Sequence, residues 1–230
     1  MKTALMAIVG LIGMIPGARA TVIISQSQTL PSPPADLIIS QGTPATGSYA
    51  WNGLPSPNRR DLGQSFKAPA DMALKDLTLN FYAFGNKAPG ASFTLKIYET
   101  DNRADNPATG QVVFSDAGTL PSDLAVGYVT FDLGSAVDLT AGKYYTFIFS
   151  FNQMIANEAV NFGVSQSTPS FDGLRWESAD GTTFTNTGGI SGSKLVFYAY
   201  GEPIPEGNST ALLGLGVLVA LGCLSRKQSR

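Results

Sequence analysis

Segment 101–107 has the sequence Asp-Asn-Arg-Ala-Asp-Asn-Pro. It is the part of the chain with the most side-chain oxygens that could coordinate a metal ion. Carboxylate and amide oxygens are the ligands that calcium prefers, so Asp101, Asn102 and Asp105 form a candidate calcium site. Arg103 stands where an EF-hand loop needs Asp or Asn, and the segment is therefore not an EF-hand. The alternative is a plain turn between two strands, in which Asn, Asp and Pro supply the turn conformations. Both interpretations stay open.

Paired carboxylates are a second chemistry, because most glycosidases work with two Asp or Glu side chains. Carboxylates on or beside expected strands are Glu99, Asp101, Asp132, Glu158 and Glu177. Nothing in their spacing singles out a pair, since Asp is common in turns and Glu at strand edges. A glycosidase is therefore the third choice of function, and we assign no catalytic residue.

Four aromatic residues are candidates for sugar binding, because aromatic faces stack on sugar rings while polar groups orient them. They are Trp176, Trp51, Tyr49 and Tyr82. Charged neighbours on both sides of Trp176 favour a ring that solvent reaches. The alternative is that isolated aromatic residues belong to the core, as we expect of Phe147, Phe149 and Phe151.

Composition excludes several classes of protein. The chain has 230 residues, no histidine and one cysteine, which excludes His-dependent catalytic triads, His-bearing zinc sites and a disulfide framework. A formal net charge of -2 argues against nucleic-acid binding. We therefore expect a protein that is not an enzyme and has no cofactor apart from the candidate calcium ion.

The middle of the chain has the two-residue periodicity of half-buried strands. Within 74–82, Leu77, Leu79 and Phe81 alternate with polar residues, and the segment around Leu95 repeats the pattern. Further expected strands are 62–67, 111–115, 126–133, 144–152, 159–165, 175–177 and 194–200. These elements predict an all-β fold, an antiparallel β-sandwich of jelly-roll type over 61–201. A loosely ordered lead-in, 21–60, has short edge strands at 22–24 and 37–39.

Residues 1–20 have the order of parts found in a secretory signal peptide. Lys2 precedes an apolar run over 4–15, and Ala18 and Ala20 form a small-x-small cleavage pattern. We expect a signal-peptide helix and a mature chain that begins near Thr21. The alternative is a buried N-terminal helix of the mature fold.

The C-terminal segment 202–230 has the layout of a membrane anchor. An apolar stretch over 211–224 is followed by the basic residues Arg226, Lys227 and Arg230. With its uncharged flanks the segment spans about 27 Å as a helix, close to the hydrocarbon thickness of a bilayer. We expect a single transmembrane helix with the basic stop on the cytoplasmic side. The alternative is a C-terminal core helix or strand.

Residues 205–230 resemble the PEP-CTERM sorting signal of Gram-negative bacteria. Pro205 and Glu206 stand at the first two positions of the Pro-Glu-Pro element, and Gly207 stands where the second proline is expected. The resemblance implies recognition by an exosortase, a membrane-embedded cysteine protease. It also implies cleavage near the element and delivery to the cell surface or an exopolysaccharide matrix.

Two internal segments, 137–145 and 63–66, resemble parts of the extracellular jelly-roll ectodomains that often precede such signals. This resemblance implies a fold and no activity. We therefore expect an exported, non-enzymatic β-sandwich, held transiently at the inner membrane by one span, with a structural or adhesive role. The alternative is a carbohydrate-binding module that acts on exopolysaccharide.

Overall fold

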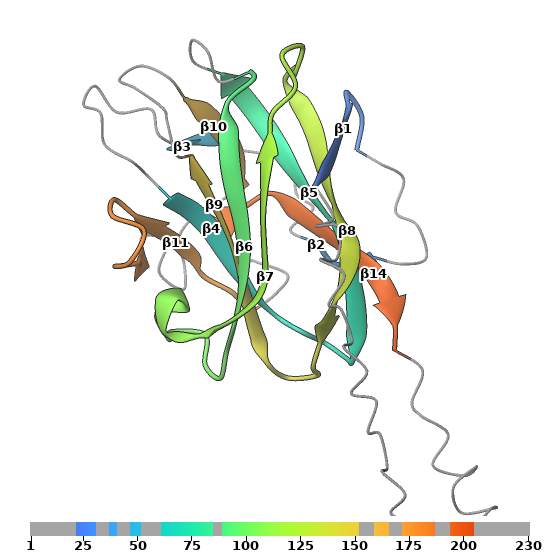
Figure 1. Cartoon of the computed structure of the whole chain (residues 1–230), viewed down its shortest axis with the longest axis vertical. Helices are drawn as coiled ribbons and strands as arrows, with labels where there is room; N and C mark the ends of the chain where they lie inside the picture. The colour runs from blue at the N-terminus through green and yellow to red at the C-terminus, as the bar shows by residue number, and fades with distance from the viewer. Residues whose placement is uncertain are drawn as a thin grey trace, which may run out of the picture.

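The computed structural model describes residues 22–30, 37–40, 47–51, 61–84, 89–151, 159–165, 172–186 and 194–204. These residues form β-strands that assemble into two antiparallel sheets (Figure 1). One short 3-10 helix, η1 (Pro107–Thr109), interrupts the strands. The prediction of an all-β fold with two antiparallel sheets is confirmed.

Sheet A has eight strands. They are β1 (Ile23–Ser27), β2 (Leu37–Ser40), β3 (Gly47–Trp51), β5 (Met72–Phe84), β8 (Gly127–Leu139), β10 (Val160–Ser165), β13 (Lys194–Leu195) and β14 (Phe197–Pro203). The main order is β1-β8-β5-β10-β13, while β14 pairs with both β5 and β2, and β3 pairs with β10.

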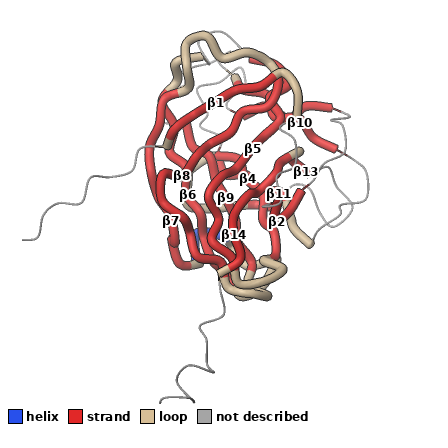
Figure 2. Tube along the Cα trace, turned by 90° about the vertical axis from the view of Figure 1, so that its right-hand side faces the viewer, coloured by secondary structure: helices blue, strands red, loops and turns tan. Residues whose placement is uncertain are grey.

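Sheet B has six strands. They are β4 (Asp61–Lys67), β6 (Ser92–Thr100), β7 (Gln111–Thr119), β9 (Tyr144–Phe151), β11 (Arg175–Ser178) and β12 (Thr185–Asn186). The order is β12-β11-β4-β9-β6-β7, and Figure 2 shows β7, β6, β9, β4 and β11 side by side. Between β4 and β11 the chain passes repeatedly from one sheet to the other. Each layer therefore depends on strands far apart in the sequence.

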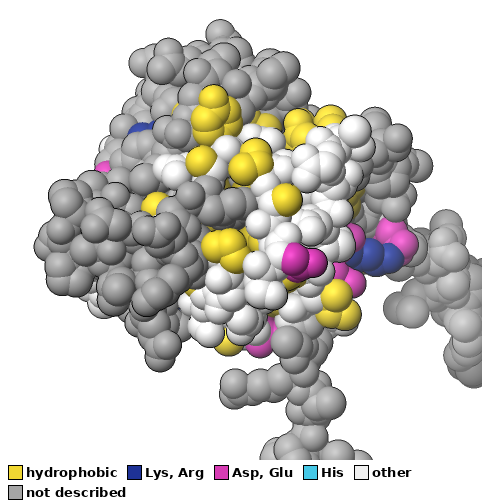
Figure 3. Space-filling model, turned by 90° about the horizontal axis from the view of Figure 1, so that it is seen from above, with side chains coloured by type: hydrophobic (Ala, Val, Ile, Leu, Met, Phe, Trp, Pro, Cys, Tyr) yellow, Lys and Arg dark blue, Asp and Glu magenta, His cyan; other side chains and the backbone are white. Residues whose placement is uncertain are grey.

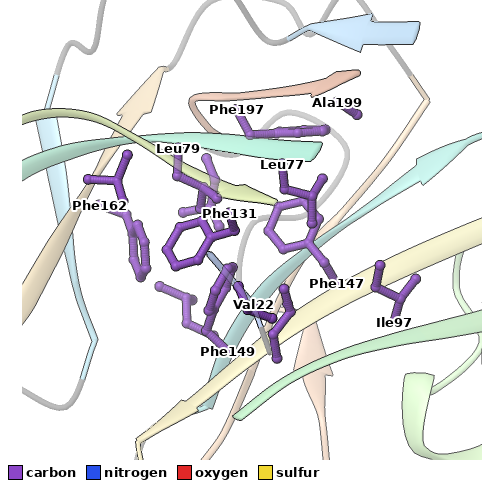
Figure 4. Packing of buried hydrophobic residues seen from close by; sticks show 14 of the residues in the cluster. Val22, Leu77, Leu79, Ile97, Phe131, Phe147, Phe149, Phe162, Phe197 and Ala199 are labelled. Carbon is purple, nitrogen blue, oxygen red and sulfur yellow. The ribbon is translucent and has the colours of Figure 1, made fainter. Parts of the chain in front are cut away.

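The core lies between the two sheets and is rich in phenylalanine (Figure 4). The expectation that Phe147, Phe149 and Phe151 of β9 belong to the core is confirmed, since all three are at most 1% exposed. The rings of Phe131, from β8, and Phe149 meet with centroids 4.7 Å apart, which joins sheet A to sheet B. Burial of each such side chain contributes about 1.5–3 kcal/mol to the free energy of folding. These contacts therefore stabilise the sandwich and hold its strands in place.

The short strands expected in the lead-in belong to the sandwich. β1 pairs with β8 and β2 pairs with β14. Val22 is 5% exposed and lies in the core cluster. β3 and β12 were not expected, because neither segment has a clear alternation of apolar and polar residues. β8 also continues past its expected end at residue 133, through a bulge at Gly134 with φ +67.

The start of β1 and the end of β14 lie toward the same end of sheet A. Ile23 pairs with Asp132, which in turn pairs with Asp76 of β5. Pro203 pairs with Met72, the first residue of β5. β14 points to the lower end of the molecule in Figure 1. β1 therefore begins at the level of Asp76, four residues along β5 from the level at which β14 ends.

The helices expected at the two ends of the chain lie outside the described residues. Glu202 and Pro203, which we expected to begin the sorting segment, continue β14 instead. Within the part of the chain that the structure describes, no helix has the length and apolar character needed to cross a membrane.

Candidate functional site

A polar pocket of about 320 Å³ lies at one end of sheet B. It sits where β6 ends, η1 and β7 begin, and the turn before β9 approaches. Its lining includes Glu99, Thr100, Asp101, Asp105, Thr109 and Gln111, with Lys143. The volume is at the small end of the range for ligand sites in proteins. This pocket contains two of the three expected calcium ligands, and it is the candidate functional site.

The loop over 101–110 is organised by its own side chains. Asp105 Oδ2 accepts hydrogen bonds from the Asn102 backbone N–H at 2.9 Å and from its Nδ2 at 3.3 Å. Asn106 caps η1, because its Oδ1 accepts from the Ala108 backbone N–H at 3.0 Å. A Cβ at Gly110 would lie 2.3 Å from the Glu99 carbonyl oxygen, so only glycine allows this approach. These contacts indicate the turn that the sequence offered as an alternative.

The floor of the pocket is a network around Glu99. The Tyr145 hydroxyl donates to Glu99 Oε2 at 2.9 Å and accepts from the Thr140 backbone N–H at 2.8 Å. Lys143 Nζ forms an ion pair with Asp101 and lies 3.9 Å from Glu99 Oε1. The hydrogen bond to Asp101, with the negative charge of that residue, raises the pKa of Lys143. Lys143 is therefore a fixed cation between two carboxylates.

The three expected calcium ligands are engaged by other side chains of the protein. Asp105 is bonded to Asn102, while Asp101 is paired with Lys143. Across the described ranges, no group of three His, Cys, Asp or Glu side chains is placed to hold a metal ion. The arrangement suits a ligand with both hydrogen-bond donors and acceptors, since carboxylates and an ammonium group line the same hollow.

A second polar cluster holds the loop after Arg103 against the sheet. The Tyr144 hydroxyl donates to Asp172 Oδ2 at 2.5 Å, and Arg103 Nη1 donates to Asp172 Oδ1 at 2.7 Å. The hydrogen bond from Tyr144 is the largest reason why the pKa of Asp172 is lowered, followed by the contribution of Arg103 against the opposing effect of burial. Lys67 Nζ lies 5.6 Å from the centre of the Tyr144 ring. The cluster joins three segments that are distant in the sequence.

Trp176 is 4% exposed, so the expectation of a reachable ring is wrong. It packs in a cluster on the outer face of sheet B with Tyr98, Ile148, Leu174 and Phe184. A hydrogen bond joins the segment before β11 to β4, since the Leu174 N–H donates to Ser65 Oγ at 2.8 Å. The flanking charges misled the prediction, since the ring packs against Tyr98 and Ile148 from distant strands as well as against Leu174 and Phe184.

The other sugar-binding candidates lie on sheet A. Tyr82 is 51% exposed and is therefore reachable from solvent. Trp51 and Tyr49 are on β3, which pairs with β10, and the side chains of both lie outside the described residues. β10 also pairs with the end of β5 that carries Tyr82. β10 is therefore a common neighbour of the strand that carries Trp51 and Tyr49 and of the strand that carries Tyr82.

The carboxylates considered for glycosidase chemistry are dispersed. Glu99 and Asp101 approach the same ammonium group, that of Lys143. Asp132 is on sheet A and Glu177 is on β11. Glu158 lies outside the described residues. The sequence did not single out Lys143, Tyr145 or Asp172, because the contacts that make them relevant join separate strands.

The targeting residues lie outside the described part of the chain. They are Ala18 and Ala20 of the expected signal cleavage site, Pro205, Glu206 and Gly207 of the sorting element, and Arg226, Lys227 and Arg230 of the basic stop. These assignments stay predictions.

No protein-family model and no curated protein matches this chain. The function is therefore argued from the residues and their geometry.

Proposed function

We propose that the chain is an exported, non-enzymatic β-sandwich protein that its C-terminal segment sorts to the cell surface or extracellular matrix. The two ends carry the sequence features of a secretory signal and a PEP-CTERM-like sorting signal. Between them lies a β-sandwich in which the chain passes repeatedly from one sheet to the other between β4 and β11, and we assign it to the jelly-roll type. An exosortase is the processing partner, and a single span holds the inner-membrane intermediate.

The observation that carries this proposal is that β1 begins and β14 ends toward the same end of sheet A. Ile23 is in register with Asp132, and Pro203 with Met72. During export, both ends of the body would emerge from a single membrane surface. A sandwich in which both strand ends lie in the half of sheet A that contains Met72 fulfils this condition without rearrangement.

The experiment is fractionation of a Gram-negative host that has an exosortase. We expect the full chain at the surface or in the matrix, and a variant without residues 205–230 in the periplasm. Replacement of both Pro205 and Glu206 by Ala should retain an intermediate in the inner membrane. A matched pair of changes in an exposed loop, Asp123→Ala with Ala125→Ser, is the control. An identical distribution of all four proteins would contradict sorting by this segment.

Carbohydrate binding is the second candidate function, favoured by the exposure of Tyr82. Tyr82 is 51% exposed, Val126 46% and Leu30 38%. Tyr82 and Val126 lie next to the Phe81–Gly127 pair, at the end of sheet A opposite to Met72. Seen from above, the described surface shows hydrophobic side chains set in mostly uncharged surface, with a few charged side chains among them and toward one side (Figure 3). A neutral sugar ring suits such a surface, because it stacks on an aromatic face and needs few charges.

A glycan array probed with the exported protein tests this second function. We expect binding of a neutral exopolysaccharide fragment that Tyr82→Ala abolishes. Tyr82→Phe is the matched control, because it retains the ring and should retain the binding. Binding that survives Tyr82→Ala would contradict the assignment of this residue.

A further inference from the structure

A row of oxygen-bearing side chains crosses three strands on the outer face of sheet A. Tyr200 of β14 is in register with Asp76 of β5, and Asp76 is in register with Asp132 of β8. The flanking residues Leu77 and Phe131 point into the core, so the row itself points outward. Directly opposed residues in antiparallel strands have Cβ atoms about 5 Å apart. The three side chains are therefore neighbours.

The next row along the same strands shows how closely such pairs approach. Thr78 and Thr130 stand two residues from Asp76 and Asp132, on the same outward face. Their hydroxyl oxygens are 2.7 Å apart. The outward side chains of β5 and β8 thus converge in this region.

Two of the three polar groups in the row have no hydrogen-bond partner among the described residues. The Tyr200 hydroxyl is buried without a hydrogen-bond partner, in a residue that is 7% exposed. Asp76 is half-buried, and among the described residues its carboxylate accepts no hydrogen bond. Asp132 is exposed, and its Oδ1 accepts from the Gly134 backbone N–H at 2.7 Å. An unpaired buried hydroxyl such as that of Tyr200 is costly, so its persistence beside two carboxylates calls for a ligand.

The nearest lysine is already engaged. Lys75 Nζ forms an ion pair with Glu202, which follows Tyr200 on β14. Burial, followed by the charge of Asp132, raises the pKa of Asp76 above its ordinary value, while Lys75 opposes the rise. Burial, followed by the negative charge of Asp76, also raises the pKa of the Tyr200 phenol. The Tyr200 hydroxyl is therefore neutral at pH 7.

We propose that Asp76 and Asp132 bind a divalent cation of the calcium type, with the Tyr200 hydroxyl as a neutral third oxygen. Hard cations prefer carboxylate ligands and accept neutral oxygens and water in the remaining positions. The exposed side of Asp132 leaves room for that water. The site is separate from the pocket beside Lys143, and it would tie β14 to β5 and β8 near the end where the chain leaves sheet A.

Terbium luminescence tests the site, because Tb³⁺ replaces calcium and is excited through a nearby tyrosine. The full-length chain, solubilised in detergent and freed of metal with a chelator, is titrated with Tb³⁺ and then with Ca²⁺. We expect sensitised emission that saturates and that Ca²⁺ displaces. Asp132→Asn should weaken binding at least about tenfold. Tyr200→Phe should weaken binding and alter the emission, while the melting temperature in chelator reports that the variant is folded.

Two control variants test whether a loss of ion binding is specific to the site formed by Asp76 and Asp132. Asp138→Asn makes the same change at another exposed aspartate of β8 and should leave the affinity unchanged. Asp101→Asn, in the polar pocket, should also leave it unchanged, because Lys143 already neutralises that residue. Wild-type protein that binds neither ion would overturn the proposal. Equal affinity of Asp132→Asn and wild type, or loss of binding in Asp101→Asn alone, would overturn it as well.

Discussion

Trp176 lies directly opposite Gly63 where β11 pairs with β4. A Cβ at Gly63 would lie 1.9 Å from the Phe147 carbonyl oxygen and 2.6 Å from Ile148 Cδ1. Ile148 also belongs to the outer cluster that buries Trp176. The absence of a side chain at Gly63 and the burial of the indole are therefore two parts of one packing arrangement.

Gly63→Ala should destabilise the protein by about 1–3 kcal/mol, the usual cost of forced overpacking. The methyl group meets backbone at Phe147, which cannot rotate away as a side chain can. The free energy of unfolding from urea titration measures the effect. A free energy equal to that of the wild type would contradict the close approach of β4 and β9.

Trp176→Ala should cost about 3–5 kcal/mol, as truncation of buried aromatic residues does. Tyr82→Ala should stay within about 0.5 kcal/mol, because Tyr82 is half-exposed. Urea titration of both variants beside a glycan-binding assay separates stability from recognition. We expect Trp176→Ala to lower stability and Tyr82→Ala to abolish glycan binding. If Trp176→Ala abolished glycan binding without loss of stability, Trp176 would again be a candidate sugar-binding residue.

Asp76→Asn should stabilise the protein at pH 7 when divalent cations are absent. The raised pKa means that the folded state binds the proton of Asp76 more tightly than the unfolded state, whose pKa is near 3.8. The stability that this proton contributes is complete below pH 3.8 and is lost as the pH rises through the folded pKa.

Melting temperatures of both proteins from pH 3 to pH 7 in chelator measure the difference. The advantage of Asp76→Asn should shrink as the pH falls. Asp132, Lys75 and Tyr200 are the titratable groups that act on Asp76 and are unchanged in the comparison. A constant difference across the range would show that repulsion of the ionised carboxylate is not its cause.

Asp172→Asn should lower stability at pH 7, by less than about 1 kcal/mol because the pair is largely exposed to solvent. The pKa of Asp172 is lowered from 3.8, so its contribution is present above 3.8 and is lost as the pH falls through the folded pKa. Thermal melting at pH 7 and at acid pH checks this. Tyr144→Phe, which removes the hydrogen bond at 2.5 Å, should reproduce the loss.

The strands of the sandwich could be predicted wherever burial follows a simple alternation. Leu77, Leu79 and Phe81 show this on β5, because one face meets the core and the other does not. β3 and β12 lack that signal, since pairing to β10 and β11 sets their strand structure rather than their own side-chain pattern.

The site geometry could be predicted only in part. Asp101 and Asp105 are close in sequence, and the pocket contains both. Lys143 and Tyr145 reach the pocket from a distant turn, and Asp76 faces Asp132 only through the register of β5 with β8. Such contacts are set by register, which a single sequence leaves open.

The intact mass of the exported product tests the proposed sorting most directly. The account predicts a chain that begins near Thr21 and ends close to Pro205, Glu206 and Gly207, after removal of both terminal segments. A product on the cell surface that still ends at Arg230 would contradict it.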